Sequence, residues 1–138
     1  TKFLTDVAVF PDINIIDQIE IPSSITQVIG IGGGSVLDTA KALYAKILTD
    51  GQYSLTDIIV SPHILDKTFG VKRCKHQLIL VPTTFGTSSE ITKWATIWNW
   101  QEKKKYSLSH NVLYADKAII LPLLSTGPYQ DILQHQLA

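Results

Sequence analysis

The sequence predicts an α/β fold built on a parallel sheet, and three observations support this. Residues 27–31, 77–81 and 117–121 are apolar runs of strand length, each ended by glycine or proline. Residues 35–48 separate the first two runs and carry apolar side chains at helical spacing. Residues 93–108 contain an alternating run and a turn, which predicts a β-hairpin. Apolar runs that alternate with a helix are typical of buried parallel strands.

The composition is that of an ordinary globular domain. The 138 residues suit a single domain, residues 1–138, and a hydrophobic content of 45% is enough for a packed core. The formal net charge is zero, which argues against a nucleic acid or a membrane surface as partner. No apolar run approaches the roughly 20 residues that span a bilayer. The single cysteine, Cys74, cannot form an internal disulfide, which favours a reducing, cytoplasmic compartment.

The segments around the first strand are shorter and less regular. Residues 10–14 favour a turn, and residues 15–20 favour a short helix that Pro22 ends. Residues 55–60 suit either a short helix or a strand. Residues 63–75 carry mixed charges and suit a solvated connecting loop.

The glycine turn, Gly32 to Gly34, lies between the first strand and the helix. Glycines allow a phosphate to approach the backbone closely, and a helix start supplies N–H donors. Ser35 is expected to be the N-cap, and Ser35 with Asp38 has the spacing of a capping box. The turn lacks the last glycine of the usual dinucleotide fingerprint and the lysine of a P-loop. A phosphate cradle and a tight strand-to-helix connection therefore both remain open.

A second loop follows the strand at residues 77–81. Residues 82–90 contain five hydroxyl side chains and one glycine. Ligands of open parallel sheets bind beyond the carboxyl ends of the strands, where both this loop and the glycine turn are expected. The alternative is a turn whose hydroxyls cap their own backbone.

The predicted hairpin alternates two kinds of side chain. Trp94, Thr96 and Trp98 lie on one face, with Ala95 and Ile97 on the other. In a neutral chain the tryptophans favour packing over base stacking. The lysines at 103–105 suit a solvated edge.

Metal-ligand spacing occurs at one place only. Asp131 and His135 are four residues apart and would share a helix face. Two ligands do not make a metal site, so a surface pair is the better interpretation. No metal ligand and no nucleophile motif is assigned.

Two segments together resemble the iron-containing (group III) alcohol dehydrogenases. Residues 32–41 (GGGSVLDTAK) are similar to that family's GGGSxxDxAK signature, which dehydroquinate synthases and glycerol-phosphate dehydrogenases share. Residues 82–92 (PTTFGTSSEIT) resemble the PTTxGTGSEVT loop of the alcohol dehydrogenases, which is far more specific. Ser88 replaces the second glycine of that loop. Residues 94–98 and 104–108 are similar to the branch of phosphonoacetaldehyde reductases.

This resemblance implies a partial nucleotide-binding domain of the dehydroquinate synthase-like kind. Family members place the pyrophosphate of NAD or NADP on the glycine turn and the nicotinamide side along the threonine loop, and a hairpin lysine reaches the cofactor. The residues implied in cofactor binding are Gly33, Gly34, Ser35, Asp38, Thr83, Thr84, Thr87, Ser89 and Lys105.

The resemblance also implies what the chain lacks. Family members hold a divalent metal, iron or zinc, through an Asp and three His in a C-terminal helical domain, and this sequence does not contain those ligands. We therefore expect a fragment of an NAD(P)-dependent alcohol dehydrogenase that is inactive alone, with a dinucleotide and a small alcohol or aldehyde as implied partners. Apolar surface that the missing domain would cover predicts a homo-oligomer. A non-catalytic nucleotide-binding or interaction remnant remains an alternative, and a dehydroquinate synthase-type lyase is one that the threonine loop argues against.

Overall fold

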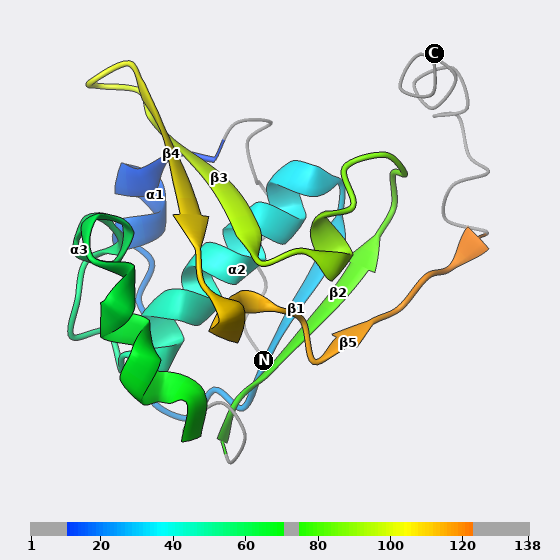
Figure 1. The fold of residues 1–138 in the computed structure, drawn as a ribbon, viewed down its shortest axis with the longest axis horizontal. Helices are drawn as coiled ribbons and strands as arrows, with labels where there is room; N and C mark the ends of the chain where they lie inside the picture. The colour runs from blue at the N-terminus through cyan, green and yellow to red at the C-terminus, as the bar shows by residue number, and fades with distance from the viewer. Residues whose placement is uncertain (1–10, 71–74, 123–138) are drawn as a thin grey trace.

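A computed structural model describes residues 11–70 and 75–122. Helix α2 (Gly34–Leu48) lies between two β layers (Figure 1). A three-stranded parallel sheet packs on one side of α2, and a two-stranded antiparallel hairpin packs on the other. In the part of the chain that is described, no helix has the length and apolar character needed to cross a membrane.

The sheet confirms the predicted parallel arrangement. Strands β1 (Gln27–Gly32), β2 (Gln77–Pro82) and β5 (Lys117–Ala118) lie in the order β1-β2-β5, with β2 in the centre. Gln27 pairs with Gln77 and Gly32 with Pro82, so β1 and β2 end side by side. The strand predicted at 77–81 is buried as expected.

The burial predicted for the outer two strands is wrong. Ile29 and Ile31 in β1 are 54% and 59% exposed, and β5 is only two residues long and exposed. The reason is that α2 covers one face of the sheet, and no described element covers the opposite face. On the covered face, Gly30 lets α2 approach closely, because a Cβ there would lie 2.8 Å from the Cβ of Ala40.

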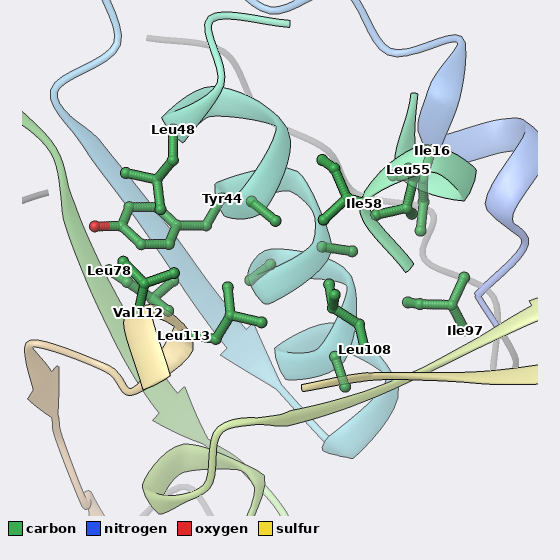
Figure 2. Packing of buried hydrophobic residues seen from close by; sticks show 14 of the residues in the cluster. Ile16, Tyr44, Leu48, Leu55, Ile58, Leu78, Ile97, Leu108, Val112 and Leu113 are labelled. Carbon is green, nitrogen blue, oxygen red and sulfur yellow. The ribbon is translucent and has the colours of Figure 1, made fainter. Parts of the chain in front are cut away.

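The core forms where α2 meets the strands and the smaller helices (Figure 2). Leu37 of α2 and Leu80 of β2 are fully buried at the sheet interface. Tyr44 is buried as well, and its hydroxyl donates to the His76 carbonyl oxygen at 3.2 Å. Leu108 of the hairpin closes the core from the opposite side of α2.

The smaller helices differ in part from expectation. Helix α1 (Ile13–Asp17) begins earlier than predicted, because the Asp12 side chain accepts a hydrogen bond from the Asn14 N–H and caps it. Residues Leu55–Val60 form α3, with a capping box between Ser54 and Asp57. The loop expected from residue 63 onward is wrong over its first part, since Pro62–Thr68 is a 3-10 helix whose Leu65 is fully buried.

The predicted hairpin is confirmed. Strands β3 (Trp94–Asn99) and β4 (Lys104–Ser109) pair from Trp94 with Ser109 to Asn99 with Lys104. Ala95 and Ile97 face the core, while Trp94 is exposed, which matches the predicted alternation. The pair Asp131 and His135 lies outside the described residues.

Candidate functional site

The two loops predicted to meet at the sheet edge do meet there. The Thr83 N–H donates to the Gly32 carbonyl oxygen at 2.9 Å, directly beyond the paired ends of β1 and β2. A Cβ on Gly33 would lie 3.2 Å from Thr84 Oγ1, and a Cβ on Gly34 only 2.9 Å from Thr87 Cγ2. The glycines therefore allow the threonine loop to approach the helix start.

Helix α2 begins one residue before the predicted position. Its N-cap is Gly33, whose carbonyl accepts from the Val36 and Leu37 N–H groups. The expectation that Ser35 caps the helix is therefore wrong, and Ser35 stands inside the first turn. Gly33 has no side chain that could bond the N–H groups of that turn, and the start of a helix favours a negative charge through the helix dipole.

Asp38 does not form the predicted capping box, because tertiary contacts use both of its carboxylate oxygens. Asp38 Oδ1 accepts from Ser89 Oγ at 2.7 Å, and Asp38 Oδ2 accepts from the Thr96 N–H at 2.9 Å. One side chain of α2 thus joins the threonine loop to the hairpin. A direct contact of Asp38 with a cofactor stays a prediction.

The threonine loop ends in an unusual backbone conformation. Ser88 has φ 52° and ψ 23°, in the left-handed region that favours glycine. This is the position at which the sequence departs from the glycine of the PTTxGTGSEVT pattern. The short 3-10 helix Ser89–Ile91 follows directly and turns Ser89 inward, where it is buried.

A cleft of about 420 Å³ lies between the helix start, the threonine loop and the hairpin. Of the nine predicted residues, six line it: Gly34, Ser35, Asp38, Thr87, Ser89 and Lys105. The other three, Gly33, Thr83 and Thr84, lie on the same loops but not on the cleft wall. The remaining wall residues, which the sequence analysis did not assign to the site, are Pro11, Thr92, Trp94, Thr96 and Trp98.

Most of the cleft residues that the sequence analysis did not assign to the site belong to one face of the hairpin. Sequence alternation placed Trp94, Thr96 and Trp98 together, but that face was assigned to packing. In the structure Trp98 stacks on Trp100, with ring centroids 5.4 Å apart, and Lys105 Nζ lies 5.8 Å from the Trp98 ring centroid. The cleft therefore has an aromatic wall with a cation above it.

Among the described residues there is no group of three or more His, Cys, Asp or Glu that could hold a metal ion. The described part of the cleft therefore does not fit a metal ion. No step through a metal is derived from these residues.

Comparison with known proteins matches most of the chain. The family model for iron-containing alcohol dehydrogenase matches residues 7–122. A phosphonoacetaldehyde reductase from Streptomyces viridochromogenes is 33% identical over 99 residues, which are 72% of this chain and 25% of that protein. A 4-hydroxybutyrate dehydrogenase from Clostridium kluyveri is 35% identical over 105 residues, which are 75% of this chain and 25% of that protein. The chain spans about a quarter of the length of these relatives.

Solved structures give the same fold. A sulfoacetaldehyde reductase from Bifidobacterium kashiwanohense, crystallised with NAD+, matches with a TM-score of 0.67 and 26% identity, over 88% of this chain and 31% of that one. An iron-containing alcohol dehydrogenase matches with a TM-score of 0.72 over 98% of this chain and 35% of that one, but at 19% identity this likeness shows the fold alone.

Proposed function

Because this chain belongs to the iron-containing alcohol dehydrogenase family, we propose that it supplies part of the nucleotide-binding domain of an NAD(P)-dependent alcohol dehydrogenase. The observation that carries the proposal is the cleft, where the glycine turn, the threonine loop and Lys105 meet. The relatives named as reductases of phosphonoacetaldehyde and sulfoacetaldehyde suggest a small aldehyde with an anionic group as the substrate class.

The residues around the cleft suit the two ends of a dinucleotide. The first turn of α2 has the positive end of the helix dipole and a cap without a side chain, so Gly34 and Ser35 would receive the pyrophosphate. Thr87 would line the nicotinamide side, and Lys105 would add a positive charge opposite the phosphates. A bound nicotinamide supplies hydride transfer, and the protein holds and orients it.

We expect the chain by itself to bind a dinucleotide weakly. In the described ranges β1 pairs only with β2, so the cleft has no sheet beyond β1 to support the rest of the ligand. Each missing neutral hydrogen bond costs about 0.5–1.5 kcal/mol, so two or three would shift a micromolar Kd toward about 1 mM. Titration calorimetry with NAD and NADP measures this. Absence of heat with both would contradict the proposal.

Turnover is tested separately, by following the formation of NADH. The described residues contain no group of three or more possible metal ligands that would place a metal beside the substrate oxygen, so we expect no NADH to form when an alcohol and a divalent metal are added. Metal-dependent NADH formation by this chain would show that it contains a complete catalytic centre.

We also propose that the chain self-associates through the uncovered sheet face. This face exposes Ile29 and Ile31, and a groove of about 310 Å³ lies beside β1, lined by β1, by α2 and by residues between 19 and 25. Such apolar surface is typical of interfaces. Light scattering should give a mass above that of one 15.3 kDa chain. The double variant I29K/I31K should lower this mass, while V60K, at an exposed position of α3, should not. A single-chain mass at high concentration would contradict self-association.

A further inference from the structure

Lys41 is a fully buried lysine in the middle of α2, and it does not line the cleft. Its ammonium group donates three hydrogen bonds to one short segment. Lys41 Nζ lies 3.1 Å from Ser89 Oγ, 3.3 Å from Thr92 Oγ1 and 2.7 Å from the Trp94 carbonyl oxygen. Three donors thus meet three acceptors within residues 89–94.

We propose that Lys41 is a positioning residue that fixes residues 89–94 against α2 and so sets the shape of the dinucleotide cleft. All three of its partners belong to residues that line the cleft: Ser89, Thr92 and Trp94. Ser89 accepts from Lys41 and donates to Asp38 Oδ1, while Asp38 Oδ2 accepts from the Thr96 N–H. The network therefore runs from the helix through the loop to the first residues of β3.

The spacing on the helix makes this arrangement possible. Asp38 and Lys41 are three residues apart and share one face of α2. Asp38 accepts hydrogen bonds from Ser89 and Thr96. Lys41 donates hydrogen bonds to the segment at residues 89–94. A buried ammonium with unmatched hydrogens would be costly, whereas here each hydrogen has an acceptor.

The charge of Lys41 matters to this role. Burial lowers the pKa of Lys41 to about 8, and the negative charges of Asp38 on its own helix and Glu90 on the loop partly oppose that shift. At pH 7 the side chain is therefore charged and carries all three hydrogens. Its positive charge also offsets Asp38 beside the proposed pyrophosphate position.

Hydrogen exchange without any ligand tests the positioning role directly. In K41M we expect the Thr96 amide and residues 89–94 to exchange at least about tenfold faster at pH 7, because the segment loses three hydrogen bonds from a charged donor. T92V removes one acceptor and should give a smaller increase. Equal exchange at Thr96 in K41M, T92V and the unmodified chain would overturn the proposal.

Lys46 supplies a matched control on the same helix. It is also buried, and it donates to the Ile16 and Asp17 carbonyl oxygens and pairs with Asp17 Oδ1 at 3.1 Å, away from the cleft. K46M should therefore lower the stability without faster exchange confined to residues 89–96. If K41M and K46M speed exchange over the same residues, Lys41 contributes only general stability, and the proposal is wrong.

Binding of NAD gives a second readout, and this arm rests on the proposed function. The pyrophosphate is negative, so binding raises the pKa of Lys41, and affinity should fall as the pH rises from 7 to 9. If binding raises the pKa by one unit from about 8, affinity falls about tenfold in total, and about fivefold of that fall lies between pH 7 and pH 9. K41M should bind more weakly at pH 7 and lack this pH dependence, while K46M should retain it.

The hydrogen-exchange and NAD-binding experiments distinguish failure of the proposed function from failure of the positioning role of Lys41. If the unmodified chain does not bind NAD, the proposed function fails, and hydrogen exchange still decides the role of Lys41. If the unmodified chain and K41M bind NAD equally with parallel pH profiles, the positioning role fails, while the proposed function stands.

Discussion

Gly34→Val is expected to remove measurable dinucleotide binding. A Cβ at this position would lie 2.9 Å from Thr87 Cγ2 and 3.2 Å from Thr87 Cβ, closer than real side chains pack. Valine adds two further methyl groups, so the threonine loop must move away from the helix start, and the added side chain covers the first-turn N–H groups. We expect NAD affinity to fall by roughly 100-fold or more, about 2.7 kcal/mol, as measured by titration calorimetry.

Gly70→Val is the matched control for this substitution. A Cβ on Gly70 would meet nothing within 4 Å, so the same change there should leave the heat of NAD binding unaltered. Circular dichroism and an unfolding curve on Gly34→Val separate loss of the ligand site from loss of the fold. Equal heats from folded Gly34→Val and the unmodified chain would mean that the glycine turn is only a strand-to-helix connection.

Leu80→Ala is expected to cause the largest loss of stability of any change considered, about 3–5 kcal/mol. Leu80 is fully buried in the central strand on the α2 face of the sheet, and its Cδ2 would lie 3.1 Å from a Cβ built on Gly30 of the neighbouring strand β1. Removing it leaves a cavity between β2 and α2, and close packing on both sides prevents collapse. Urea denaturation followed by tryptophan fluorescence measures the free energy of unfolding.

Ile31→Ala supplies the comparison for Leu80→Ala. Ile31 is an aliphatic residue of the same sheet, but it is 59% exposed on the uncovered face. At a protein concentration low enough to keep the chain monomeric, so that this face is not covered by a second copy, its truncation should cost about 0.5 kcal/mol or less. Similar losses for both variants would contradict the assignment of the core to the α2 face of the sheet.

The pattern Ser-x-x-Asp occurs twice in this chain, and it forms a capping box at only one of the two places. At Ser54 and Asp57 it forms a capping box, because Asp57 is exposed and has no competing partner in the described structure. At Ser35 and Asp38 it does not, because Ser89 and Thr96 occupy the Asp38 carboxylate. A local pattern predicts a local contact only where no distant donor competes for the same atoms.

Local sequence determined the strands, the long helix, the hairpin and the two loops of the site. Apolar periodicity and glycine or proline at the ends specify such elements without distant contacts, and the parallel order then places both loops at one sheet edge. The nine residues implied in cofactor binding came from the resemblance of two motifs to a known family, and six of them line one cleft.

Tertiary structure alone decided the burial of the outer strands and the partners of the charged side chains. Burial depends on which element covers each face, so equally apolar runs became a core strand at β2 and exposed edges at β1 and β5. Lys41 and Lys46 look alike in sequence, yet Lys41 holds the cleft segment and Lys46 holds α1. The reason is that hydrogen-bond partners 29 to 58 residues away become neighbours only after α2 has packed between its two β layers.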